Sequence, residues 1–108
     1  MKTVEEYLRE NPSFEHEVMS VKSPRSRVGG PYKIVKICDK GDYAIVTLYW
    51  DENPALGIRW FDKYPGMPAS HGYRTWFIIP SGLWNAIIPT LDEDKQDYVR
   101  AFLQPAGE

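Results

Sequence analysis

Cationic side chains interleave with aromatic rings in the middle third of the chain. A guanidinium offers a planar fork of N–H donors and a ring offers a flat apolar wall, so together they suit a flat ligand, an anion or a peptide. His71 would add a group that titrates near neutral pH. The same rings and arginine stems also suit the core and margin of a small domain, and that alternative stays open. The residues that we expect to line a binding surface are Arg59, Trp60, Tyr64, His71, Tyr73, Arg74 and Trp76.

Sequence patterns that indicate catalysis or metal binding are missing. Ser81 lacks the leading glycine of a nucleophile elbow, and the pair Gly29-Gly30 has no lysine directly after it and no helix to open. The two histidines and Cys38 are too scattered for a zinc site. We therefore predict a non-enzymatic binding or protein-interaction domain with no catalytic residue, no metal and no cofactor. The rival hypothesis is a small enzyme that uses His71 with a carboxylate such as Asp62 as an acid–base pair.

Charge is unevenly distributed, although the net charge is only −2. Residues 22–40 hold six cations against one anion, and Arg25, Arg27, Lys33 and Lys36 could contact phosphates while Tyr32 stacks on a base. This defines a nucleic-acid alternative. The low net charge argues against it, because nonspecific affinity for nucleic acid comes mostly from a positive surface. Charged loops and lysines on an outer strand also have an ordinary role in keeping the protein soluble.

Length and composition fit one domain over residues 1–108, since 108 residues with 43% apolar side chains supply one core. No apolar run is long enough to span a bilayer. Cys38 is the single cysteine, and the first residues lack the apolar stretch of a secretory signal. We expect a cytoplasmic protein with no membrane partner, whose partner is a small molecule or a protein. The surplus of aromatic residues would also allow a homodimer.

Runs of β-branched and aromatic residues predict an antiparallel sheet of about four strands, over residues 32–38, 43–50, 56–61 and 73–79. Gly41 lies in the short connection between the first two runs and favours a hairpin there. In the third strand, alternation places Arg59 and Phe61 on the face opposite Ile58 and Trp60.

Helices are expected near both ends of the chain. Thr3 with Glu6, and Thr90 with Glu93, have capping-box spacing, which predicts helices over residues 3–10 and 91–104. Ser81 could cap a two-turn helix that ends before Pro89, whereas residues 14–21 fit either a helix or a strand. The fold class is therefore α+β, with the N-terminal and C-terminal helices packed on one face of the sheet.

The middle of the chain resembles a pattern found in small uncharacterised bacterial proteins that are carried on mobile elements such as integron cassettes. The matching residues are Gly57-Ile58-Arg59-Trp60, then Gly66 and Pro68, then Gly72-Tyr73-Arg74-Thr75-Trp76-Phe77-Ile78-Ile79-Pro80. The resemblance implies a bacterial origin. It implies no catalytic residue, because that group has no assigned activity.

Overall fold

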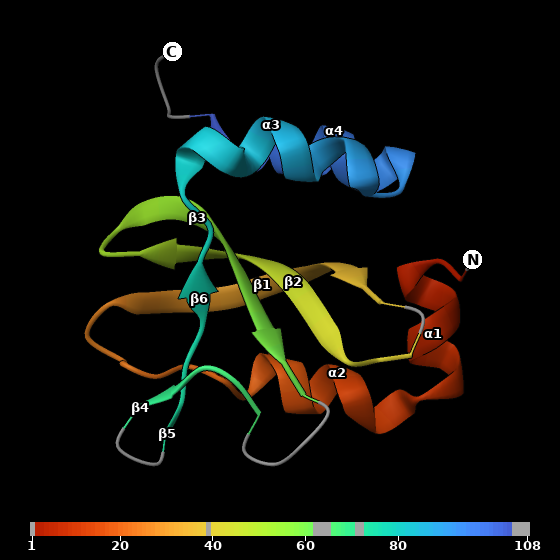
Figure 1. Ribbon diagram of the computed structural model, residues 1–108, viewed down its shortest axis with the longest axis horizontal. Coiled ribbons are helices and arrows are strands. Elements are labelled where there is room, and N and C mark those ends of the chain that lie inside the picture. The colour runs from red at the N-terminus through yellow and green to blue at the C-terminus, as the bar shows by residue number, and fades with distance from the viewer. Residues whose placement is uncertain (1, 39, 62–65, 71–72, 105–108) are drawn as a thin grey trace.

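Strands β1 (Val28–Ile37), β2 (Tyr43–Trp50), β3 (Asn53–Trp60) and β6 (Phe77–Ile78) form one open antiparallel sheet in the computed structural model of the chain (Figure 1). Their order in the sheet is β1-β2-β3-β6. A separate two-stranded ribbon pairs β4 (Ala69–Ser70) with β5 (Tyr73–Arg74). The structure describes residues 2–38, 40–61, 66–70 and 73–104. The α+β class and the antiparallel sheet of four strands are confirmed.

The first three strands are joined by tight turns that set the register of the sheet. β2 has the predicted bounds, and Gly41 takes a φ of +72° in the turn before it. β3 begins at Asn53 instead of residue 56, because Asp51 and Glu52 both take positive φ and reverse the chain within two residues. β1 begins at residue 28 instead of 32 and runs through the glycine pair.

The predicted fourth strand over residues 73–79 is interrupted, which corrects the expectation of one continuous strand. Its first part pairs with β4 and its second part pairs with β3. Trp76 lies between the two parts, is buried, and donates from its indole Nε1 to the carbonyl of Val21 at 2.7 Å. The strand breaks there because the indole enters the core and its N–H needs an acceptor.

Helices α1 (Val4–Glu10) and α2 (Pro12–Met19) follow one another at the N-terminal end. The predicted capping box of α1 is present: the Thr3 hydroxyl accepts from the Glu6 amide at 3.1 Å, and the Glu6 carboxylate accepts from the Thr3 amide at 3.0 Å. Residues 14–19, for which the sequence left helix and strand open, are helical because they belong to α2. Phe14 and Val18, one turn apart, form its buried face.

The C-terminal helical region consists of short pieces followed by α4 (Glu93–Leu103). Instead of one two-turn helix, the chain forms the 3₁₀ helix η1 (Ser81–Leu83), the α-helix α3 (Trp84–Ile87) and the 3₁₀ helix η2 (Ile88–Thr90). Neither Ser81 nor Thr90 caps a helix as predicted. Pro80 and Asp92 occupy the N-cap positions, and the Thr90 hydroxyl donates to the Ile87 carbonyl. No helix in the described part of the chain is long and apolar enough to cross a membrane.

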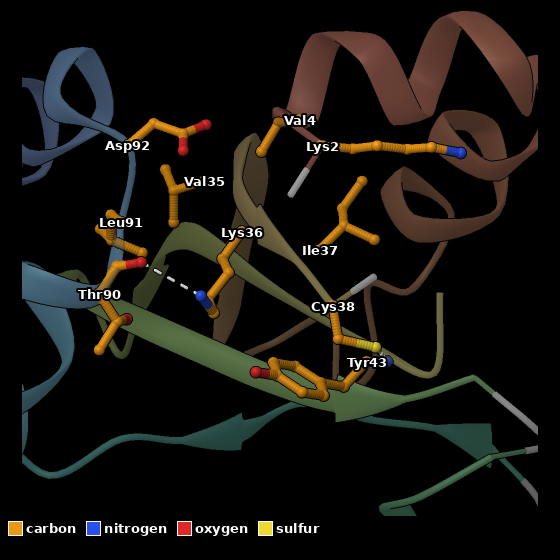
Figure 2. Close-up of a pocket in the computed structure, with 10 residues that line it drawn as sticks. All are labelled: Lys2, Val4, Val35, Lys36, Ile37, Cys38, Tyr43, Thr90, Leu91 and Asp92. Atoms are coloured by element: carbon orange, nitrogen blue, oxygen red, sulfur yellow. Dashed lines mark hydrogen bonds between the residues drawn. The ribbon is translucent and has the colours of Figure 1, made fainter. Parts of the chain in front are cut away.

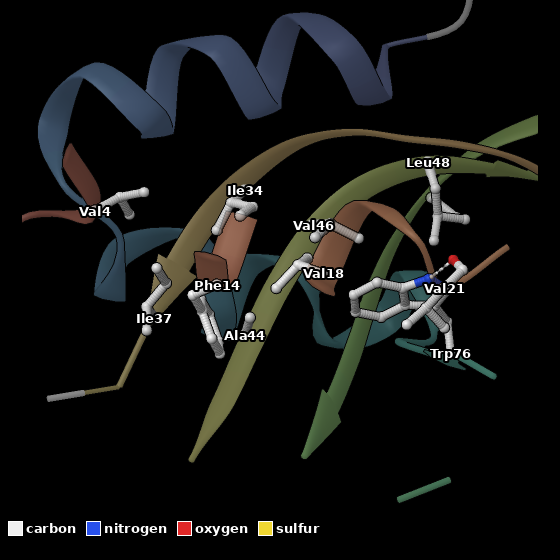
Figure 3. Close-up of a cluster of buried hydrophobic side chains, with 11 residues drawn as sticks. Val4, Phe14, Val18, Val21, Ile34, Ile37, Ala44, Val46, Leu48 and Trp76 are labelled. Carbon is white, nitrogen blue, oxygen red and sulfur yellow. Dashed lines mark hydrogen bonds between the residues drawn. The ribbon is translucent and has the colours of Figure 1, made fainter. Parts of the chain in front are cut away.

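The helices cover both faces of the sheet (Figure 1), which corrects the expectation that they share one face. On one face, Phe14 and Val18 of α2 pack with Val46 and Leu48 of β2 (Figure 3). On the opposite face, a second cluster joins the sheet to the C-terminal helical region. Its buried members are Val35, Ile45, Leu56, Ile79, Ile88, Leu91, Val99 and Leu103.

The composition of β2 explains why helices pack on both faces of the sheet. Every residue from Ala44 to Leu48 is buried, so the side chains that alternate across the strand enter an apolar layer on either side. Thr47 is the polar member of this run, and its hydroxyl is hydrogen-bonded to the Tyr98 hydroxyl of α4 at 3.0 Å. A strand with no polar face requires helices on both sides of the sheet.

Lys95 of α4 forms an ion pair that joins helices from the two layers. Its side chain is buried, and its Nζ donates to Glu5 of α1 at 2.5 Å and to Asp94 at 2.8 Å. Burial would lower the pKa of Lys95, but the hydrogen bonds to Asp94 and Glu5 outweigh that effect and raise it. The hydrogen bond from Lys95 in turn lowers the pKa of Glu5.

Replacing Glu5 with glutamine is expected to lower the free energy of unfolding by about 1 kcal/mol at neutral pH, because a charged acceptor of the buried ammonium is lost. The folded-state pKa of Glu5 lies below its usual value of 4.5. Its stabilising effect is therefore present above that pH and is lost as the pH falls through the folded-state pKa. Urea unfolding from neutral to acidic pH should show a weaker acid dependence for Glu5→Gln than for the wild type.

Glu15→Gln is the matched control, since Glu15 is exposed on α2 and has no hydrogen bond or ion pair within the described residues. If the Glu5→Gln and wild-type curves ran parallel down to acidic pH, the ion pair would not stabilise the fold.

Candidate functional site

The structure separates the residues that were expected to share one binding surface. Arg59 and Trp76 are buried, whereas Trp60 and Tyr73 are exposed and Arg74 is half-buried. Alternation places Arg59 with Phe61 as predicted, and the Arg59 guanidinium lies 5.0 Å from the centre of that ring. That face of β3 is covered, so Arg59 and Trp76 are corrected from surface residues to interior ones. Tyr64, His71 and the proposed partner Asp62 lie outside the described residues.

Arg59 holds the chain segment after β3 against the sheet. One guanidinium nitrogen, Nη1, donates to the carbonyls of Pro68 and Thr75, both at 2.9 Å. Burial lowers the pKa of Arg59 to about 10, the charge of Arg74 acts in the same direction, and Glu17 opposes it. The group is therefore a cation at neutral pH, and two of its contacts are hydrogen bonds to backbone carbonyls inside the protein.

Gly66 allows its part of the chain to lie close to the backbone of β3. A Cβ at this position would lie 2.1 Å from the carbonyl oxygen of Trp60 and 2.6 Å from Nη2 of Arg59, and the residue has a φ of +75°. The amide and carbonyl of Trp60 are both hydrogen-bonded to Met67, at 2.7 and 3.1 Å. The exposed Trp60 ring packs beside Tyr43, with 5.9 Å between ring centres.

Tyr73 and Arg74 lie beside the start of residues 22–40, the basic segment, which follows α2. Together with Lys22 and Arg25 they line a surface depression of about 390 Å³ that also includes Ser20. Two neighbouring depressions of about 500 and 410 Å³ share Arg25, Val28 and Tyr32 in their walls. We call these three adjoining depressions the Arg25 groove. It joins two residues of the predicted binding surface to two residues of the basic segment.

The cations of the Arg25 groove fall into two groups. Arg74 is positioned by the Glu17 carboxylate at 3.7 Å and donates to the Ser20 hydroxyl at 3.1 Å. Arg27 is paired with Asp51 at 3.0 Å. In contrast, the exposed side chains of Lys22 and Arg25 form no ion pair or hydrogen bond with the part of the chain that the structure describes. These two cations are available to an anion from solution.

Two other lysines of the basic segment do not line the groove. Lys33 lies over the Tyr98 ring of α4, 4.5 Å from its centre, and Lys36 donates to the Thr90 carbonyl at 3.1 Å. The sequence therefore predicts a larger basic surface than the structure has, because these two lysines of β1 contact the C-terminal helical region instead. From the sequence alone, Lys22 and Arg25 belong to the basic segment and Tyr73 and Arg74 to the predicted binding surface. The two pairs are distant along the chain, so no sequence pattern indicates that they share one groove.

A smaller pocket of about 170 Å³ lies between the start of α1, the end of β1 and the start of α4 (Figure 2). Its two lysines are engaged, Lys2 with Glu10 and Lys36 with the Thr90 carbonyl. Cys38, at its edge, accepts hydrogen bonds at Sγ from the amides of Asp42 and Tyr43. This pocket offers no unengaged cation, so the Arg25 groove is the stronger candidate.

Comparisons with known proteins add no constraint on the function. No family model, curated protein or solved structure matches this chain. The resemblance to integron-cassette proteins, the bacterial origin and the cytoplasmic location stay predictions. Among the described residues, no group of three or more histidine, cysteine or acidic side chains is placed to hold a metal ion.

Replacing Arg59 with methionine is expected to destabilise the fold by about 2–4 kcal/mol, because the carbonyls of two half-buried residues, Pro68 and Thr75, lose a charged donor. Urea unfolding provides the measurement. Arg9→Met serves as the control, since Arg9 is an exposed residue of α1 and has no hydrogen bond or ion pair within the described residues. Equal stability of the two variants would show that Arg59 does not anchor the segment.

Proposed function

We propose that the protein is a non-enzymatic binding protein that takes an anionic ligand in the Arg25 groove. The observation that carries this proposal is the pair of exposed cations, Lys22 and Arg25, in a concave surface beside a third cation that is already held in place. A free guanidinium in a depression can bind a phosphate, sulfate or carboxylate with two parallel hydrogen bonds.

The fixed position of Arg74 supports this proposal. Glu17 and Ser20 hold the Arg74 side chain against the end of α2, so little rotational freedom is lost when a ligand binds. The ligand need not displace Glu17, because a guanidinium carries five N–H donors and the protein uses few of them. Tyr73 next to Arg74 supplies an exposed ring at the rim of the same depression.

The enzyme alternative and the homodimer stay predictions. His71 and Asp62, the acid–base pair that the sequence suggested, lie outside the described residues, so no catalytic step is proposed. A homodimer would be detected by light scattering during size-exclusion chromatography, independently of ligand binding.

Titration with sodium pyrophosphate, followed by amide NMR, tests the proposed function. Pyrophosphate is expected to shift the signals of residues 20–27 and 73–74 and to leave those of α1 unchanged. The Arg25→Ala variant should bind about tenfold more weakly, which corresponds to the loss of about 1.4 kcal/mol from a charged hydrogen-bonded contact.

Arg9→Ala is the control that removes the same charge from α1, a helix that contributes no residue to the walls of the Arg25 groove. Shifts that concentrate at the pocket of Figure 2, or an Arg25→Ala affinity equal to that of the wild type, would refute the groove as the anion site.

A further inference from the structure

Aromatic rings flank the free cations of the Arg25 groove. Tyr73 is 67% exposed and makes no ring contact with the described part of the chain, and Tyr32 is 55% exposed. Lys22 and Arg25 line both the depression that contains Tyr73 and the depression that contains Tyr32. The two cations therefore lie along the path between the rings.

The Tyr32 ring is held in place by its surroundings. It packs edge-on against Tyr49, with 5.6 Å between ring centres, and also contacts Phe102 of α4. Gly30 leaves room for it, since a Cβ there would come within 2.8 Å of the ring. A ring fixed in this way loses little conformational freedom when a flat ligand stacks on it.

We propose that the Arg25 groove binds single-stranded nucleic acid, an inference that rests on the anion-binding function proposed above. A single strand alternates phosphates with bases whose faces are free to stack, and this matches cations that lie between exposed rings. A duplex offers its phosphates but hides its base faces, so the tyrosines would gain nothing from it.

The distribution of cations favours a nucleic acid over a phosphorylated peptide. Recognition of a phosphorylated side chain uses cations that converge on one phosphate. Here Lys22 and Arg25 are shared between neighbouring depressions, while Arg27 and Arg74 are each tied to a carboxylate. Glu52 at the far depression and the net charge of −2 limit the electrostatic attraction. The site is therefore short, and stacking contributes a large share of the affinity.

The salt dependence follows from these contacts. Two phosphates neutralised by Lys22 and Arg25 give an expected slope of log K against log salt of about −1.4, since each phosphate contact on a single strand contributes about −0.7. A protein that bound through a broad basic surface would show a much steeper slope.

Fluorescence anisotropy with a labelled oligothymidylate of about 10 nucleotides tests the proposal. The wild type should bind the single strand more tightly than a duplex of the same length or inorganic tripolyphosphate. Tyr73→Ala should weaken binding about tenfold while Tyr73→Phe retains it, because stacking needs the ring and not the hydroxyl. The double variant Lys22→Ala/Arg25→Ala should weaken binding and flatten the salt dependence.

Two controls remove comparable side chains elsewhere: Phe77→Ala removes an exposed ring of β6, and Arg9→Ala removes an exposed cation of α1. Both should bind like the wild type, and near-ultraviolet circular dichroism should show that every variant is folded.

The outcomes separate the two proposals. Binding of tripolyphosphate or a phosphoserine peptide that depends on Arg25 but exceeds oligonucleotide binding, or an unaffected Tyr73→Ala variant, would overturn the nucleic-acid inference and leave the anion site standing. Equal affinity for duplex and single strand would also overturn the inference. If none of the anions bound in an Arg25-dependent way, the proposed function itself would be refuted.

Discussion

Hydrogen bonds from two buried side chains, Arg59 and Trp76, attach residues 66–70 and 73–76 to the rest of the protein. The guanidinium binds the carbonyls of Pro68 and Thr75, and the indole binds the carbonyl of Val21. These contacts hold both walls of the Arg25 groove, since β5 belongs to the first wall and the chain after Val21 forms the second. Leaving these buried donors without their partners would cost about 1–3 kcal/mol each, so the hydrogen bonds stabilise the position of both walls.

The protein uses its cations in different ways according to their burial. Lys95 and Arg59 are buried and bind carboxylates or carbonyls of the protein itself. Arg27 and Arg74 are partly or largely exposed, and each is oriented by one carboxylate. Lys22 and Arg25 are exposed without such a partner in the described part of the chain. The functional proposal depends on this last pair, because Lys22 and Arg25 keep all their N–H donors for a ligand, whereas Arg74 beside them shares its donors with Glu17 and Ser20.

Covering both faces of the sheet determines where a ligand can bind. The N-terminal and C-terminal helices occupy the two faces (Figure 1), so the inward-facing side chains of β2 and β3 are removed from solvent. Exposed polar and aromatic groups then gather at the margin, where the segment after α2 meets β5 and the start of β1. Connecting segments on a rigid scaffold are common places for binding residues, because they can vary without disturbing the core.

The sequence by itself determined the local structure: the capping box of α1, the hairpin at Gly41, the bounds of β2 and the shared face of Arg59 and Phe61. Each of these depends on neighbouring residues, whose spacing fixes backbone geometry or side-chain direction. Only the tertiary structure decided that this face is buried, that the helices lie on opposite sides of the sheet and that Trp76 interrupts the fourth strand. It also brought Arg25 beside Tyr73. Such outcomes depend on which surfaces meet after folding, and residues far apart in sequence carry no local signal of that meeting.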